Sequence, residues 1–214
     1  MEIGFNIIYG NHSLQIELAN SLIQHCIEAE IPVQKESKKD NILWINILVS
    51  RSIVEKQIFD IVWQMDQPGN KEYNNLKRYE DCKKIWEFSQ SSTIERIKQG
   101  YKSTYISFPL PNIKNKIKVT MDNKSIDILL LGSFSSRRDK IIKILTQKGI
   151  NAKLESSAWS TEQKREIISQ TKIMLNMHYY YPSYQESYRI LESLYYGACV
   201  ISEYSDDKNI DNDL

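Results

Sequence analysis

A short segment in the second half of the chain combines residue types that can hold a diphosphate. An apolar run over residues 126–131 ends at Gly132 and Ser133, and two guanidinium groups follow at Arg137 and Arg138. Serines at such a point can cap a helix whose free N–H groups then face an anion, and arginine side chains bind phosphate oxygens through paired hydrogen bonds. The segment therefore indicates a phosphate site. A capped helix with solvated arginines is the structural alternative.

A second group of charged residues repeats every three positions, at Glu186, Arg189 and Glu192. On a helix this spacing places all three on one side. Ser183 followed by Glu186 has the pattern of a capping box, which predicts a helix start there, and Gly197 suits the helix end. A carboxylate on this side can accept hydrogen bonds from ribose hydroxyls, and a guanidinium can steady a phosphate or a leaving oxygen. The alternative is a ladder of salt bridges in which Glu186 only caps the helix.

Three further side chains are candidates because each follows an apolar run of strand length. His178 precedes tyrosines 179–181, and an imidazole beside aromatic rings can bind a sugar or a base, or can serve as a structural residue. His12 could act as a general base toward an acceptor hydroxyl, or could simply begin a helix. Asp66 could orient an acceptor, or form the turn before Pro68.

Short apolar strands alternate with helices in both halves of the chain, which predicts parallel sheets with helices on both faces. The predicted strands cover residues 3–9, 42–49, 58–63, 103–108, 126–131, 151–154, 173–177 and 198–202. The predicted helices cover residues 14–23, 91–98, 138–148 and 183–196, with another opening at 161 and a charged segment over 71–88 that has apolar residues along one side. We expect two facing, doubly wound Rossmann-like domains, residues 1–112 and 126–214, joined by a linker over 113–125 that follows two prolines.

The composition is that of an ordinary globular protein without a global attraction to polyanions. Lys and Arg number 28 against 27 Asp and Glu, a net charge of +1, so nothing in the overall charge indicates a nucleic-acid partner. Cys26, Cys82 and Cys199 form no CxxC pair and argue against a disulfide framework or a zinc ribbon. No window approaches a membrane span and the start lacks a signal-peptide pattern, so we expect a cytoplasmic protein.

These motifs together resemble glycosyltransferases of the GT-B fold, in particular viral and bacterial enzymes related to glycosyltransferase families 1 and 4. The resemblance rests on residues 127–138, 173–179 and 189–203, with less specific matches over 61–67 and 85–89. It implies a hexosyltransferase-type enzyme with a nucleotide diphosphate sugar in the C-terminal domain, an acceptor met across a cleft, no cofactor and no obligatory metal. By the same resemblance Glu192 binds the donor ribose, residues 132–138 approach its phosphates, and Arg189 and His178 lie in the pocket.

Two departures from the family pattern leave alternatives open. Many retaining members have a second glutamate eight positions before the one that matches Glu192, where this chain has Tyr184, and Glu186 is displaced by two. Family members also continue beyond the position of Leu214, so we expect an incomplete C-terminal domain. The sequence therefore leaves open retention or inversion, and a catalytically degenerate relative that only binds a nucleotide sugar or a partner. An unrelated doubly wound nucleotide-binding or signalling module is the third possibility.

Overall fold

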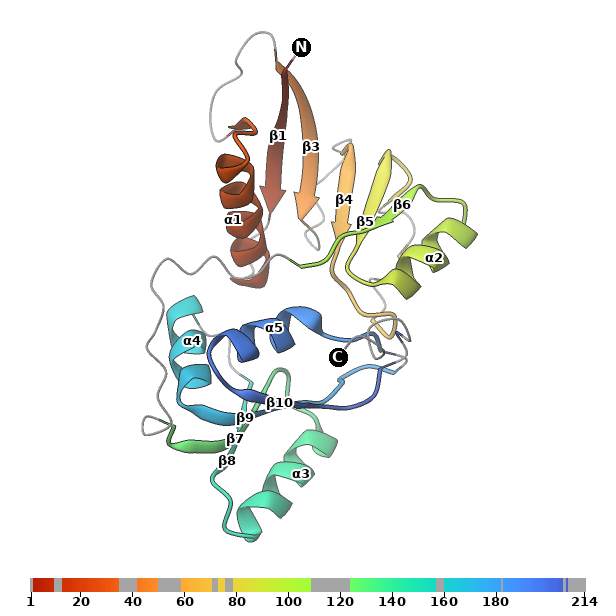
Figure 1. The fold of residues 1–214 in the computed structure, drawn as a ribbon. Coiled ribbons are helices and arrows are strands. Elements are labelled where there is room, and N and C mark those ends of the chain that lie inside the picture. Colours follow the sequence, from red (N-terminus) through yellow and green to blue (C-terminus); the bar gives the residue numbers. More distant parts are fainter. Residues whose placement is uncertain are drawn as a thin grey trace. The chain divides into compact units, whose positions relative to one another are not determined.

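The protein is an α/β protein with two parallel sheets, as predicted (Figure 1). The computed structural model describes residues 2–9, 13–34, 42–49, 59–70, 73–75, 79–108, 124–156, 160–181, 183–205 and 207. The chain divides into two compact units: unit 1 is Met1–Asn112 with Pro182–Gln185 and Ser205–Leu214, and unit 2 is Ile113–Tyr181 with Glu186–Tyr204. Most of the predicted linker over 113–125 lies outside the described residues, so the predicted domain limits stay a prediction. Within the described ranges, no helix is long and apolar enough to cross a bilayer.

Unit 1 is built on a parallel sheet in the order β2-β1-β3-β4-β5-β6. Its elements are β1 (Glu2–Tyr9), α1 (Ser13–Glu28), β2 (Val33–Gln34), β3 (Ile42–Val49), β4 (Ile61–Gln64), β5 (Lys84–Glu87), α2 (Gln90–Lys98) and β6 (Ser103–Tyr105). Strands β1 and β3 pair along their whole length, and α1 contacts both. The contact face of α1 is apolar at helical spacing, with Leu18 and Ile23 buried as the sequence predicts, and Cys26, beyond the predicted helix end, is buried as well.

The region between β4 and α2 differs in detail from its sequence pattern. β4 begins at Ile61, and the described residues of the 71–88 segment form turns and a 3₁₀ residue at Tyr79, followed by β5, without an α-helix. Tyr73 and Tyr79 are buried, and the Arg96 guanidinium lies over both rings. Of the apolar residues on the predicted helix side, Tyr79 therefore packs against a buried cation, and Cys82 packs against the apolar cluster that contains Ile85.

Unit 2 has the predicted alternation of strand and helix. Its elements are β7 (Ile126–Leu131), α3 (Ser136–Gln147), β8 (Ala152–Glu155), α4 (Thr161–Ser169), β9 (Thr171–Asn176), α5 (Ser187–Tyr195) and β10 (Cys199–Ser202). The parallel sheet has the order β10-β9-β7-β8, with α3 on one face and α4 and α5 on the other (Figure 1). Successive residues of β7 supply both cores, because Leu129 and Leu131 pack in the cluster with Ile168, whereas Leu130 packs in the cluster with Ile142 of α3.

The ends of the unit 2 helices confirm most of the sequence signals, with one correction. Ser135 caps α3, and Gly149 and Gly197 have the positive φ values expected after helix ends. The predicted start of α5 at Ser183 is wrong, since α5 begins at Ser187 and its N-cap residue Glu186 makes no side-chain cap bond. The reason lies in unit 1, where the side-chain oxygen of Gln67 accepts hydrogen bonds from the Ser183 hydroxyl at 3.4 Å and the Tyr184 N–H at 2.9 Å.

Candidate anion site at the switch point of unit 2

The candidate site lies at the carboxyl ends of β7 and β9, where the strands that follow β7 in the chain lie on opposite sides of it in the sheet. From β7 the chain crosses through α3 to β8 on one side, and β9 and β10 then lie on the other side of β7. The carboxyl ends of β7 and β9 are therefore neighbours, with a helix N-terminus beside them. In open parallel sheets this switch point is where ligands bind.

Two guanidinium groups converge on Gly132, which follows β7. A Cβ at Gly132 would lie 2.9 Å from Nη1 of Arg138 and 3.3 Å from Nη2 of Arg189. The φ of Gly132 is +131°, a conformation that glycine adopts without strain. The absence of a side chain thus leaves room for two cations from different helices, and the structure brings together three of the predicted site residues.

Arg138 is held across the switch point. Its side chain is 1% exposed, its Nη1 donates to the Ser133 carbonyl at 2.8 Å after β7, and its Nη2 donates to the Met177 carbonyl after β9. The Tyr179 ring lies 5.4 Å from its guanidinium carbon, a cation–π contact. Burial and then the nearby charge of Arg189 lower the pKa of Arg138. Two like charges held this close favour an anion beside them.

Two glutamates balance part of this charge. Arg189 forms an ion pair with Glu186 and donates to the Asn176 side-chain oxygen at 3.0 Å. Arg137 forms an ion pair with Glu203 and also donates to the His178 carbonyl. We call Arg137, Arg138 and Arg189 the arginine cluster. It joins the start of α3 to the ends of β9 and β10, and its three cations face two paired carboxylates.

Glu203 is tied to this cluster through the backbone as well. Its carboxylate accepts the His178 N–H at 2.8 Å. Burial opposes ionisation of Glu203, but hydrogen bonds from Arg137 and His178 hold the pKa below its ordinary value. Sequence reasoning did not single out Glu203 or Asn176, although each closes a strand that the sequence predicts, and that position was the available signal.

His178 is the predicted site residue whose environment is least explained by packing. Its side chain is 7% exposed, and neither ring nitrogen has a hydrogen-bond partner among the described residues. A buried polar atom left without a partner costs about 1–3 kcal/mol, and such atoms cluster at functional sites. The Nε of Arg138 is also buried without a partner in the same part of the unit.

Glu186 and Glu192 have different surroundings. The Glu186–Arg189 pair spans three residues, as the salt-bridge alternative expects. Glu192 is instead 3.1 Å from the Lys164 amino group of α4, and its side chain is 3% exposed. The Lys164 amino group also lies 5.4 Å from the Tyr188 ring. A ribose at Glu192 would therefore share the carboxylate with Lys164, and the ribose role remains a prediction.

The unit 1 candidates do not form a comparable site. His12 lies outside the described residues. Asp66 is 6% exposed and accepts a hydrogen bond from the Asn70 side chain at 3.0 Å, consistent with the turn alternative. No group of three or more His, Cys, Asp and Glu side chains that could hold a metal is found in the parts of the chain that the structure describes.

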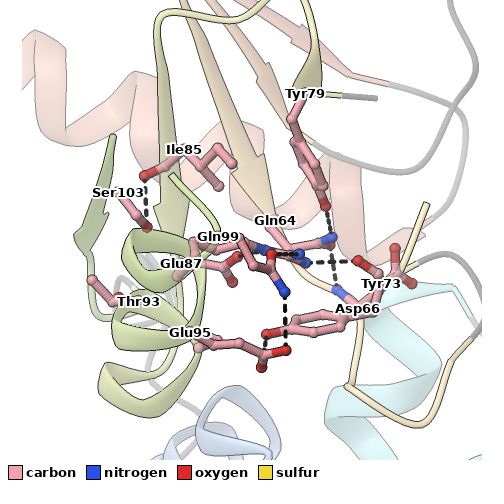
Figure 2. Close-up of polar contacts among 12 residues, drawn as sticks. Gln64, Asp66, Tyr73, Tyr79, Ile85, Glu87, Thr93, Glu95, Gln99 and Ser103 are labelled. Atoms are coloured by element: carbon pink, nitrogen blue, oxygen red, sulfur yellow. Dashed lines mark hydrogen bonds and ion pairs between the residues drawn. The ribbon is translucent and has the colours of Figure 1, made fainter. Parts of the chain in front are cut away.

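Sequence reasoning missed a buried polar cluster at the ends of β4 and β5, part of which Figure 2 shows. Glu87 and Arg96 form an ion pair at 2.9 Å with both side chains fully buried. The Arg96 guanidinium carbon lies 4.1 Å from the Tyr73 ring centroid and 4.9 Å from that of Tyr79. Burial outweighs the attraction of Arg96 and raises the pKa of Glu87 to about 7. No periodicity links Glu87 to Arg96, because they meet only after β5 and α2 pack.

Comparison of the chain with protein-family models finds no match, and comparison with curated proteins finds none either. The fold and the site define the class of protein as an α/β protein with two parallel sheets and an arginine-lined switch point.

Proposed function

We propose that the protein is a GT-B type glycosyltransferase that moves a sugar from a nucleoside diphosphate sugar to an acceptor. The observation that carries the proposal is the meeting of Arg138 and Arg189 at Gly132, beside the N-terminus of α3. The first-turn N–H groups of a helix and two guanidinium groups together suit the two phosphates of a diphosphate. The motif resemblance independently assigns residues 132–138 to the donor phosphates.

In the proposed reaction, the bond between the sugar carbon and the diphosphate oxygen breaks, and the acceptor oxygen forms a new bond to that carbon. The electron pair of the broken bond stays on the diphosphate, whose negative charge increases. Arg138 and Arg189 stabilise this charge, so the proposal requires no metal ion. His178 supplies a ring nitrogen to the donor, and His12 accepts the acceptor proton.

The donor ribose is assigned to Glu192, whose carboxylate forms an ion pair with Lys164. Ribose hydroxyls are hydrogen-bond donors, and a carboxylate accepts such bonds strongly. Two further residues belong to the proposed donor site. Glu186 orients Arg189 through their ion pair, and the Ser133 carbonyl accepts a hydrogen bond from the Arg138 side chain.

Calorimetric titration with UDP, GDP, TDP and their glucose conjugates tests the binding step. We expect Arg189→Ala and Arg138→Ala to weaken binding of the preferred nucleotide by about tenfold to a hundredfold, since each removes charge-assisted hydrogen bonds of about 1.5–3 kcal/mol. Lys140→Ala is the matched control, because it removes one exposed positive charge from α3, the helix that carries Arg138. Equal affinity of all four proteins for every nucleotide would refute the site. Release of radiolabelled sugar from the bound donor then tests transfer.

Tyr184 supports a second candidate, a glycosyltransferase-like protein that binds the donor without turnover. In place of the family carboxylate, the Tyr184 hydroxyl donates to Glu95 at 3.2 Å, and its ring packs against Tyr73 within unit 1. Tyr184 in this position contributes to packing within unit 1 and supplies no carboxylate. Nucleotide binding without release of labelled sugar, over a panel of glycan acceptors, would favour this candidate.

A further inference from the structure

Two short segments from the second half of the chain belong to unit 1, and both are bound by helix α2. They are Pro182–Gln185 and Ser205–Leu214, which join Met1–Asn112 in this unit. Their described residues are buried, with exposed fractions of 8% or less for Ser183, Tyr184, Gln185, Ser205 and Asp207. These residues therefore form part of the packed structure of unit 1.

The first segment is fixed through Tyr184. Its hydroxyl donates to Oε2 of Glu95 in α2 at 3.2 Å, and the same oxygen accepts the Tyr73 hydroxyl at 3.0 Å, a bond that Figure 2 shows. The rings of Tyr184 and Tyr73 also pack edge to face, with centroids 6.5 Å apart. The Tyr184 N–H donates to Gln67 at 2.9 Å. Three different residues of unit 1 therefore hold this segment.

The second segment is fixed through Asp207, which is fully buried. Ser91, in the first turn of α2, donates its hydroxyl to Oδ1 of Asp207 at 2.8 Å, and the Asp207 N–H donates to the Ser205 hydroxyl at 3.3 Å. A carboxylate beside the first turn of a helix is also stabilised by the positive end of the helix dipole. Ser91 and Glu95 are four residues apart, so one side of α2 holds both segments.

Both segments are joined by one or two peptide bonds to a carboxylate that pairs with the arginine cluster. Glu186, the partner of Arg189, directly follows the first segment. Glu203, the partner of Arg137, lies two residues before Ser205. Consecutive Cα atoms are about 3.8 Å apart, and two residues span at most about 7 Å. A carboxylate this close in the chain to a buried residue has little freedom to leave its arginine.

We propose that two side chains of α2, Ser91 and Glu95, are positioning residues for the arginine cluster. Each holds one of the two segments, and each segment limits the movement of the carboxylate next to it. Loss of either hydrogen bond therefore loosens one ion pair of the cluster while the fold of unit 2 is retained. Binding of a nucleoside diphosphate by the cluster rests on the proposed function, whereas the positioning does not.

Amide hydrogen exchange of the full chain, followed by NMR, tests the bond from Ser91. Ser91→Ala removes the hydroxyl that binds Asp207. The reporter is the His178 N–H, which donates to the Glu203 carboxylate at 2.8 Å. We expect this N–H to exchange about three- to tenfold faster, the effect of losing one hydrogen bond that holds the carboxylate in place. Ser91→Thr keeps a hydroxyl and should restore the exchange rate to within about twofold.

Tyr184→Phe tests the bond to Glu95 through a different reporter. The Ile190 N–H donates to the Glu186 carbonyl at 3.2 Å, and this is the first helical hydrogen bond of α5. We expect the Ile190 N–H to exchange about three- to tenfold faster in this variant, with the His178 N–H within about twofold of its usual rate. Ser91→Ala should show the opposite pattern, because each α2 side chain acts on its own segment.

Two matched variants control for a general loss of stability. Thr93→Val removes an α2 hydroxyl that donates to the Ser89 carbonyl within the helix, and Tyr101→Phe removes a hydroxyl from a ring that packs on Tyr79 in unit 1. Both variants should leave the two reporters within about twofold of their usual rates. The Asp139 N–H, in the first turn of α3, should exchange at the same rate in every variant.

The inference is overturned if either reporter keeps its usual rate in its own variant, if the control variants accelerate the reporters equally, or if the Asp139 N–H accelerates with them. UDP titration of the same samples separates the two proposals. Ser91→Ala and Tyr184→Phe should bind UDP about three- to tenfold more weakly, because the arginines must then be ordered on binding, and undiminished affinity would also overturn the positioning. Faster exchange without any UDP binding by the unchanged protein would leave the positioning and remove the donor site. UDP binding with unchanged exchange would do the reverse.

Discussion

The close approach of two guanidinium groups to Gly132 predicts that a single methyl group disrupts the arginine cluster. In Gly132→Ala the new Cβ would lie 2.9 Å from Arg138 and 3.3 Å from Arg189, at a φ of +131°. Holding an alanine at such a φ costs about 1–3 kcal/mol. Arg138 is buried and bound to two carbonyls, and displacing it weakens charged hydrogen bonds of about 1.5–3 kcal/mol each. We expect the free energy of unfolding to fall by about 2–5 kcal/mol and affinity for UDP by about tenfold or more.

Gly149→Ala separates backbone strain from displacement of the arginines. Gly149 has a φ of +80° and nothing within 4 Å of a Cβ, so its substitution introduces strain in the same unit without a clash. Urea unfolding should show both variants less stable than the unchanged protein, and calorimetry at a temperature where both are folded should show weakened UDP binding only for Gly132→Ala. If the two variants bound UDP equally well, the argument that Gly132 makes room for a phosphate-binding pair would be wrong.

Three further predictions test the charges of both units. Because the pKa of Glu87 is higher in the folded protein than its ordinary 4.5, the stability that the protonated form contributes is complete below about pH 4.5 and is lost as the pH rises through about 7. The loss should be about 2–4 kcal/mol, visible as a difference between the urea-unfolding profiles of the unchanged protein and Glu87→Gln from pH 4 to 8, and parallel profiles would contradict it. Lys124→Met should lower stability by about 2–4 kcal/mol in thermal unfolding, since the buried amino group donates to two carbonyls at 2.6 and 2.7 Å, and a loss under about 0.5 kcal/mol would show that water replaces it. Glu203→Gln should strengthen UDP binding by about two- to tenfold in calorimetry, because its carboxylate competes for Arg137, and weaker binding would show instead that Glu203 positions the arginine.

Local signals in the sequence predicted most elements of the fold because the responsible interactions are local. The Ser135 cap and the glycines after α3 and α5 act within one helical turn, and the structure confirms them. The prediction that α5 begins at Ser183 is wrong because the interaction that decides the helix start is not local. Its apparent cap residue, Ser183, hydrogen-bonds with Gln67, far away in the sequence. A capping pattern cannot indicate that a tertiary partner competes for the same hydroxyl.

The candidate site depends on strand order, which alternation of strands and helices does not determine. With β7 between β8 and β9, the Arg138 side chain can bind carbonyls that follow both β7 and β9. If β8 lay between them, β7 and β9 would be about 10 Å apart and a side chain fixed after β7 could not hold the end of β9 in the same way. Residue types and spacing therefore indicate the side chains that we propose bind a diphosphate, while the topology explains why Arg138 and Arg189, from two different helices, meet at one glycine.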